Sequence, residues 1–229
     1  MMRKPPDAAE FASQREDMVE RQLRRRGISD GRVLSAMATI PRERFVPEPY
    51  ARRAYADSAL PIGFDQTISQ PWIVAAICEA MELASSDNVL EVGTGSGYSA
   101  AVLSRLAGQV ATIERVPELA QRARETLRDL GIANVEVIVG DGSAGFPDRA
   151  PFDAIAVHAT APGAPPTLIR QLAVGGRLVV PIASRAADML TVFRRTAEDV
   201  DVASGSGLRR GVIGPCRFVP LIGAEGFAE

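Results

Sequence analysis

The chain has 229 residues, 46% of them hydrophobic, and a formal net charge of −2. This composition supplies one sizeable core and lacks both the basic excess of a nucleic-acid binder and an apolar stretch that could span a bilayer. A single histidine, His158, excludes a histidine-rich zinc site, and Cys78 and Cys216 form neither a metal-binding spacing nor an evident disulfide framework. The polar segment 1–17 lacks the apolar run of a signal peptide, so we expect a cytoplasmic protein. From the composition and the cysteine and histidine count we expect no metal, no membrane contact and no nucleic-acid partner.

The first 86 residues predict helices and turns rather than a sheet. Apolar residues recur at helical spacing before Gly27, and Ser29–Asp30 precede a second periodic run, as a helix cap would. Pro71 suits the first position of a third helix, because its missing N–H would have no partner there. The expected elements are helices at 8–27 and around 33–37, proline-broken turns at 41–49, an extended segment at 59–64 and a helix at about 72–83.

Residues 87–183 alternate between strand and helix patterns. The strand patterns are continuous apolar runs, which are typical of a parallel sheet covered on both faces. They are expected at 89–92, 110–114, 135–139, 152–158 and 177–181, with helices at 97–106, 117–130 and 166–172. Two further strand patterns, at 189–195 and 212–219, have no helix between them and predict an antiparallel pair.

These patterns together predict an α/β, Rossmann-like fold. Its sheet is mostly parallel and doubly wound, with an antiparallel C-terminal hairpin and an N-terminal helical segment. We expect one domain, 1–229, in three parts. Segment 1–86 is N-terminal and helical, 87–183 is the core, and 184–229 supplies the C-terminal strands.

A glycine-rich turn joins the first strand of this alternation to a helix. Residues 91–97 read Glu-Val-Gly-Thr-Gly-Ser-Gly, and glycine lets the backbone adopt positive φ and approach a ligand closely. The following helix start offers unpaired N–H groups and a positive dipole end. Two patterns fit: G-x-G-x-x-A from Gly95, a dinucleotide fingerprint, and E-x-G-x-G-x-G from Glu91, which occurs in methyltransferases that use S-adenosyl-L-methionine (AdoMet).

Acidic residues at the strand ends favour AdoMet. Glu91 would repel a pyrophosphate but suits the cationic methionine end of AdoMet. Glu114, after the second strand, can accept hydrogen bonds from ribose hydroxyls, as it would in an NAD site, and Asp141, after the third, can accept one from the adenine amino group. The alternatives are a solvated Glu114 and an ordinary turn at Asp141–Gly142. The expected cofactor-binding residues are Glu91, Gly93, Thr94, Gly95, Ser96, Gly97, Glu114, Arg115, Asp141 and Gly142.

The segments around this turn resemble the protein-L-isoaspartate O-methyltransferase family. The most specific block is Pro61–Pro71, which reads PIGFDQTISQP, and residues 89–98 and 140–142 continue the likeness. Further similar segments are 18–23, 41–47, 150–155, 175–181 and 217–221, so the resemblance spans about 17–223. Segment 182–188 departs from the family pattern.

The resemblance implies an AdoMet-dependent methyltransferase fold in which 1–86 face the methyl acceptor and 87–183 bind AdoMet. It implies methyl transfer to the free carboxylate of L-isoaspartyl residues in damaged proteins or peptides, whose ester then closes to a succinimide that hydrolyses partly to normal aspartate. An exposed carboxylate is already ionised at neutral pH, so a chain with one histidine needs no general base for this step. The enzyme must only align the carboxylate with the methyl group. We expect a monomer.

Ser69 is the expected catalytic residue, because the matching serine is assigned as the active-site residue in the family. At the start of a predicted helix, its hydroxyl and nearby N–H groups can hold a carboxylate, and the alternative is that it only caps the helix. Its neighbours Thr67, Ile68 and Gln70 are expected to bind the substrate, and the alternative for Thr67 and Gln70 is that they are polar loop residues without that role. His158, at a strand end, either lines the mouth of the acceptor site or packs nearby.

Three other functions stay open at this point. A relative that methylates an aspartyl carboxylate in one dedicated peptide would share both Ser69 and the glycine turn. An NAD-dependent oxidoreductase would use the dinucleotide pattern and would bind NAD in preference to AdoMet. A non-catalytic regulator would bind AdoMet and transfer no methyl group.

Overall fold

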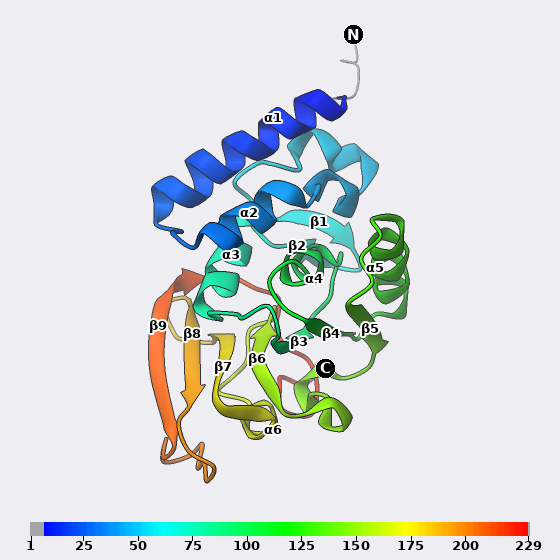
Figure 1. The fold of residues 1–229 in the computed structure, drawn as a ribbon. Helices are drawn as coiled ribbons and strands as arrows, with labels where there is room; N and C mark the ends of the chain where they lie inside the picture. Colours follow the sequence, from blue (N-terminus) through cyan, green and yellow to red (C-terminus); the bar gives the residue numbers. More distant parts are fainter. Residues whose placement is uncertain (1–6, 229) are drawn as a thin grey trace.

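A seven-stranded sheet organises the computed structural model, which describes residues 7–228 (Figure 1). The strand order is β5-β4-β3-β6-β7-β8-β9; neighbours from β5 to β7 run parallel, and β8 and β9 are antiparallel. The strands are β3 (Asn88–Val92), β4 (Gln109–Glu114), β5 (Val135–Val139), β6 (Phe152–Val157), β7 (Leu172–Ile182), β8 (Asp188–Arg195) and β9 (Leu208–Cys216). The predicted mostly parallel sheet with an antiparallel C-terminal hairpin is confirmed.

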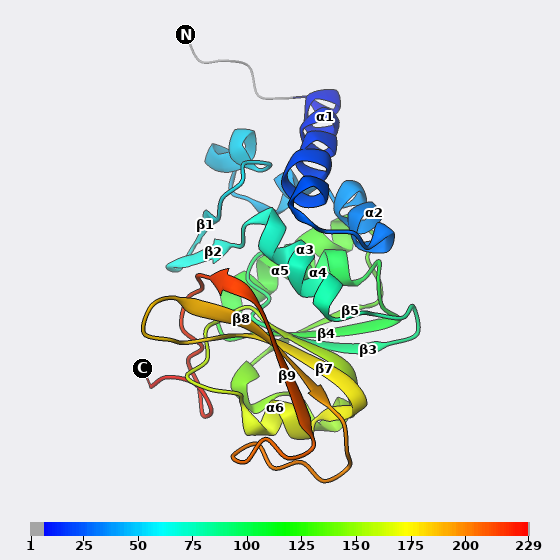
Figure 2. The same cartoon turned by 90° about the vertical axis from the view of Figure 1, so that its left-hand side faces the viewer.

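Helices cover both faces of this sheet (Figure 2). One face carries α3 (Pro71–Ala80), α4 (Tyr98–Leu103) and α5 (Pro117–Asp129), and the other carries α6 (Pro166–Arg170). Alternate side chains of β3 enter the two cores, because successive side chains of a strand point to opposite faces: Val89 joins the first core, and Leu90 and Val92 join the second. This two-sided burial explains the continuous apolar runs of the parallel strands.

The N-terminal helices stack outside the first layer of helices. They are α1 (Ala8–Met18), which continues through a π-helical turn (Val19–Leu23) and a 3-10 turn (Arg24–Arg26), and α2 (Gly31–Thr39). Gly27 ends the first run in a left-handed conformation, with φ +96°. The Asp30 carboxylate accepts hydrogen bonds from the first-turn N–H groups of Arg32 and Val33, so the expected cap of α2 is present. Further 3-10 turns span Arg42–Phe45 and Glu48–Arg53.

Two strand boundaries differ from the sequence-based expectation. β7 begins at Leu172 rather than 177, with a register shift opposite β6 near the left-handed Gly175. β9 is Leu208–Cys216 rather than 212–219, because pairing with β8 starts at Leu208. An edge strand with alternating exposure carries a weak apolar signal, so its pattern does not locate its ends.

A small antiparallel hairpin of β1 (Leu60–Gly63) and β2 (Gln66–Ile68) lies beside the main sheet. Only the first strand was expected, as an extended segment. The turn residues Phe64 and Asp65 both have positive φ, +54° and +56°, a conformation usually assigned to Asn and Gly in hairpins. The hairpin therefore has no recognisable turn signal, and it places Thr67 and its neighbours at the edge of the sheet.

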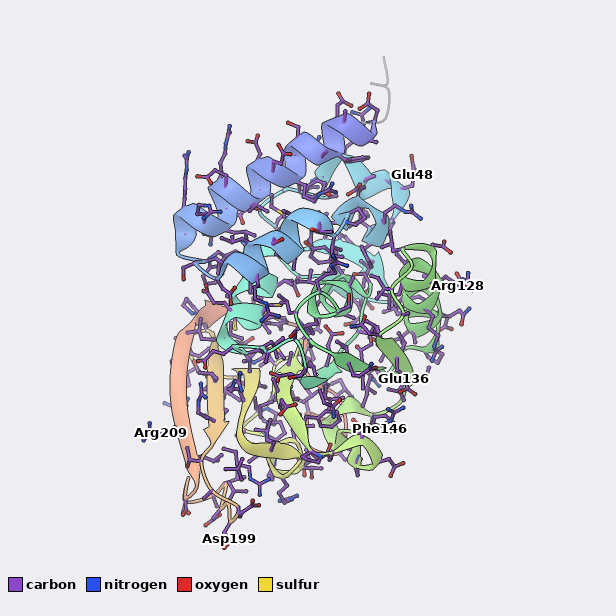
Figure 3. The ribbon with its side chains drawn as sticks, in the orientation of Figure 1. Glu48, Arg128, Glu136, Phe146, Asp199 and Arg209 are labelled. Atoms are coloured by element: carbon purple, nitrogen blue, oxygen red, sulfur yellow. The ribbon has the colours of Figure 1, made fainter. Side chains whose placement is uncertain are left out.

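The two edge strands carry charged side chains. Figure 3 shows Glu136 on β5 and Arg209 on β9 at opposite edges of the molecule, pointing away from it. Such charges discourage edge-to-edge pairing with another sheet.

Within residues 7–228 no helix is long and apolar enough to cross a membrane. Residues 1–6, which belong to the segment 1–17 that we expect not to be a signal peptide, lie outside the described residues.

Candidate active site

A cavity of about 590 Å³ opens at the carboxyl ends of β3, β4 and β6. Its other walls are lined by β2 with the residues that follow it, Ser69 and Gln70, and by the C-terminal segment 217–222. The chain leaves β3 toward β4 on one side and returns to β6 on the other, and this reversal of strand order is where open α/β sheets bind ligands. The volume lies within the usual range for small-molecule sites.

The glycine turn after β3 forms the floor of this cavity. The N–H groups of Gly93 and Thr94 donate to the Ile113 carbonyl oxygen at 2.9 and 3.3 Å, which ties the turn to β4. Gly93 and Gly95 have φ +92° and +53° and both line the cavity. A side chain at Gly93 would contact the Cβ of His158 at 3.4 Å, so glycine here lets β3 and β6 lie close together.

Glu114 faces the cavity from the end of β4. Its Oε2 accepts from the Gly95 N–H at 2.8 Å and its Oε1 from the Val116 N–H at 3.0 Å. The residue is 5% exposed, and it lines the cavity beside Arg115 and Ser96. Each carboxylate oxygen retains a lone pair, so this buried carboxylate can accept further hydrogen bonds from paired hydroxyls.

Glu91 lies beneath the glycine turn rather than in the cavity wall. It is fully buried, and its Oε2 accepts from the Thr112 hydroxyl at 2.5 Å. The Thr94 hydroxyl lies 2.6 Å from that of Thr112, so a chain of hydroxyls links the turn to Glu91. Neither Glu91 nor Thr94 lines the cavity, nor does Gly97. The side chain of Glu91 is therefore not exposed to the cavity, and its role in binding AdoMet stays a prediction.

His158 connects Glu91 to the cavity. Its Nε2 lies 2.9 Å from the Ser99 hydroxyl and 3.3 Å from Oε1 of Glu91, an oxygen that forms no hydrogen bond. The side chain is 7% exposed, packs near the Phe218 ring and lines the cavity. Lining the cavity and packing were alternatives in the sequence, and the structure combines them.

Asp141 binds the C-terminal segment instead of lining the cavity. Its Oδ1 accepts from the N–H and hydroxyl of Ser143 at 2.9 and 2.7 Å, and its Oδ2 from the Ala224 N–H at 2.9 Å. Burial alone would raise the pKa of this carboxyl, but these hydrogen bonds hold it below its ordinary value. Gly142 does line the cavity. The Asp141 carboxylate thus binds the chain just after the wall 217–222, and its predicted contact with adenine stays a prediction.

Ser69 lies between β2 and α3 and lines the cavity together with Thr67, Ile68 and Gln70. Gln70, not Ser69, is the N-cap of α3, and no side chain caps this helix. The capping role considered for Ser69 is therefore not seen. Four neighbouring residues expected to contact the acceptor do face the cavity that the glycine turn and Glu114 also line.

Several cavity residues were not expected from the sequence. Arg26, Asp57 and Trp72 form a cluster at the rim: Arg26 Nη1 lies 3.0 and 2.9 Å from the two Asp57 oxygens, and its guanidinium lies 5.1 Å from the Trp72 ring. Asp57 Oδ1 also accepts from the Gln70 amide at 2.7 Å. The resemblance included residues 217–221 without giving them a role, and local patterns carry no signal for the rim cluster.

The cavity suits a nucleoside-bearing ligand. Its floor is a glycine turn open to close approach, and Glu114 offers acceptors for ribose hydroxyls. In the described part of the chain, no group of three or more His, Cys, Asp or Glu side chains is placed to hold a metal ion.

Comparison with known proteins decides the family. The model of the protein-L-isoaspartate(D-aspartate) O-methyltransferase family matches residues 13–226. The chain belongs to this family. A protein-L-isoaspartate O-methyltransferase of Koribacter versatilis is 53% identical over 223 residues, 97% of each chain. One from Rhodopseudomonas palustris is 51% identical over 99% of this chain and 91% of its own.

Solved structures of O-methyltransferases share the fold. One protein-L-isoaspartate O-methyltransferase superposes with a TM-score of 0.80 at 31% identity, over 92% of this chain and 66% of that longer one. A Plasmodium falciparum relative, solved with S-adenosyl-L-homocysteine, gives a TM-score of 0.76 at 25% identity, over 91% of this chain and 98% of its own.

The match to this family and its relatives shows that the chain is an AdoMet-dependent protein-L-isoaspartate O-methyltransferase. The resemblance seen in the sequence is confirmed along almost the whole chain. The NAD-dependent oxidoreductase considered from the dinucleotide pattern is not supported, because the relatives that match nearly the full length are methyltransferases.

Proposed function

We propose that this O-methyltransferase transfers the AdoMet methyl group to the free carboxylate of L-isoaspartyl residues in damaged proteins or peptides, and so begins their repair. The observation that carries this proposal is the meeting of two walls in one cavity: Ser69 with its neighbours on one side, the glycine turn and Glu114 on the other. We propose that it acts as a cytoplasmic monomer without a nucleic-acid partner.

The glycine turn side of the cavity is proposed to hold AdoMet. Gly93, Gly95 and Ser96 would lie against the methionine part, Glu114 would accept the ribose hydroxyls, and Gly142 would lie near the adenine. Glu91 and Thr94 would act from beneath, by holding the turn in shape through Thr112. When bound, AdoMet supplies a methyl group activated by a sulfonium.

The Ser69 side is proposed to hold the acceptor. The Ser69 hydroxyl would donate a hydrogen bond to one oxygen of the isoaspartyl carboxylate and leave the other oxygen directed at the methyl group. Thr67, Ile68 and Gln70 would shape the acceptor pocket, and His158 would close its base above Glu91. The carboxylate is already ionised, so no residue needs to remove a proton, and the catalytic contribution is orientation.

The parts of the chain divide this work in a way that suits one domain, 1–229. Segment 1–86 supplies the acceptor side, 87–183 the AdoMet side, and 184–229 the strands from which the closing wall 217–222 emerges. The atypical segment 182–188 lies at the connection of β7 and β8, outside the cavity lining.

The test uses one peptide synthesised in two forms, isoaspartyl and normal aspartyl, with AdoMet labelled in the methyl group. We expect label in the isoaspartyl form alone, followed by appearance of succinimide. Equal labelling of both forms, or none, would contradict the proposal. Binding of AdoMet without transfer to either form would instead point to a regulator. Failure to label the isoaspartyl form of a second peptide of unrelated sequence would point to a dedicated substrate.

A further inference from the structure

A fully buried arginine lies behind Ser69. Arg42 begins a 3-10 turn after α2 and has no exposed surface. Its Nη2 donates to the Ser69 carbonyl oxygen at 2.8 Å, and its Nε donates to the Ala54 carbonyl oxygen at 2.7 Å. Its guanidinium carbon lies 4.8 Å from the centre of the Tyr98 ring. Both Ser69 and Tyr98 line the cavity, so Arg42 is one residue behind its wall.

No carboxylate balances this cation in the described part of the chain. The ionisable groups that raise the pKa of Arg42 are the Tyr98 and Tyr55 hydroxyls, which are uncharged at neutral pH, and its Nη1 has no hydrogen-bond partner. The neighbouring Glu43 instead accepts from the Tyr55 hydroxyl and lies 3.8 Å from Arg15. Burial lowers the pKa of Arg42 to about 10, which still leaves it charged at neutral pH.

An uncompensated buried charge destabilises a fold, so a buried cation such as Arg42 indicates a role other than stability. Arg42 holds the backbone of Ser69, whose own hydroxyl takes part in no hydrogen bond within residues 7–228. Its positive potential also reaches the cavity through a poorly screening interior, where electrostatic effects are stronger than in water. Both effects favour an anion that arrives at Ser69.

We propose that Arg42 is a positioning residue for methyl transfer: it fixes Ser69 through the Ser69 carbonyl oxygen and supplies the positive potential that draws the substrate carboxylate to the Ser69 hydroxyl. This inference rests on the proposed function. It assigns the charge recognition of the acceptor to a residue that never touches the acceptor.

The test compares Arg42→Met, which keeps the volume and removes the charge, with Arg42→Lys, which keeps the charge but cannot reach both carbonyl oxygens. Binding is measured for an isoaspartyl peptide and for the same peptide with the reacting carboxylate converted to an amide. Arg44→Met is the matched control, because Arg44 is exposed in the same 3-10 turn. Wild-type methylation of the isoaspartyl peptide is established first, so failure of the proposed function is seen separately.

We expect Arg42→Met to weaken binding of the carboxylate peptide by at least about tenfold and to leave binding of the amide peptide and of S-adenosyl-L-homocysteine nearly unchanged. Arg42→Lys should keep most of the binding preference for the carboxylate and lower kcat, since the Ser69 backbone loses its fixed donor. Equal weakening of all three ligands by Arg42→Met would show a purely structural role and overturn the proposal. If Arg42→Met does not fold, an Arg42→Lys variant with wild-type kcat would overturn it as well.

Discussion

At the scale of single residues, Ser69 is the first test of the acceptor side. Ser69→Ala should reduce kcat for an isoaspartyl peptide by at least about tenfold, because the carboxylate loses a charge-assisted hydrogen bond worth roughly 1.5–3 kcal/mol. The affinity for S-adenosyl-L-homocysteine, measured by calorimetry, should stay within about twofold, since the AdoMet side is intact. Because α3 has no side-chain cap, thermal stability should change little. Unchanged turnover would remove Ser69 from the mechanism.

A substitution of Glu114 tests the AdoMet side of the cavity in the same way. Glu114→Gln replaces a buried carboxylate that accepts from Gly95 and Val116 with a group that has one acceptor oxygen. We expect the KM for AdoMet to rise by at least about tenfold, with kcat at saturating AdoMet within about threefold of wild type. Glu118→Gln on the exposed first turn of α5 is the control, since it makes the same chemical change outside the cavity. An equal rise in the KM for AdoMet with both substitutions would contradict the proposal that Glu114 binds AdoMet.

At the scale of elements, the glycine turn depends on the close approach of α5. Gly97 has φ +86°, and a Cβ added there would lie 3.1 Å from the Cβ of Ala123. Gly97→Ala should cost about 1–2 kcal/mol for the left-handed backbone, plus a further cost as α5 is pushed away from the turn. Both the free energy of unfolding and AdoMet affinity should fall.

Gly131→Ala is the matched control for this prediction. Gly131 also has positive φ, +67°, but a Cβ there would meet nothing within 4 Å. It should show the backbone cost in chemical denaturation and leave AdoMet binding unchanged. If Gly97→Ala and Gly131→Ala are equally destabilising and neither affects binding, packing of α5 does not shape the turn.

At the scale of the whole molecule, the C-terminal wall is fastened to the sheet by distant contacts. Asp141 and Ser143 accept from the Ala224 and Glu225 N–H groups, and the Glu225 carboxylate accepts from the N–H and hydroxyl of Thr167 in the first turn of α6. The fastening thus joins the segment that follows the wall 217–222 to the turn after β5 and to α6.

This fastening should weaken in acid. The folded pKa of Asp141 is lowered, so the carboxylate contributes stability above its unfolded pKa of about 3.9, and this contribution is lost as pH falls through the folded value. We expect amide hydrogen exchange of 221–227, corrected for its intrinsic pH dependence, to accelerate below about pH 4. Asp141→Asn should show the faster exchange already at neutral pH.

Asp201→Asn provides the control for the acid prediction. Asp201 has a lowered pKa for a similar reason, hydrogen bonds from Ser204 and Ala203, but it lies in the turn between β8 and β9. Its substitution should not alter exchange at 221–227. Protection of that segment that is independent of pH in the wild type would show that the Asp141 contacts do not hold the wall.

The sequence by itself determined the parallel core of this O-methyltransferase and much of its site. Continuous apolar strands, glycines that need positive φ and helix caps are local signals, and the elements they predicted are present. The glycine turn and the residues after β4 and β6 line one cavity, because the carboxyl ends of parallel strands meet at one edge of a sheet. The block around Ser69 was identified by its resemblance to the family, and it lines the same cavity from the end of the separate β1–β2 hairpin.

The tertiary structure alone decided what these residues contact. His158 meets Ser99 across 59 positions of sequence, Ala224 meets Asp141 across 83, and Arg42 reaches Ser69 across 27. Such pairs depend on how helices, hairpin and C-terminal segment pack, and no local pattern encodes them. For this reason the side chains of Glu91 and Asp141, both predicted from the sequence to bind AdoMet, lie behind or beside the cavity rather than in its wall.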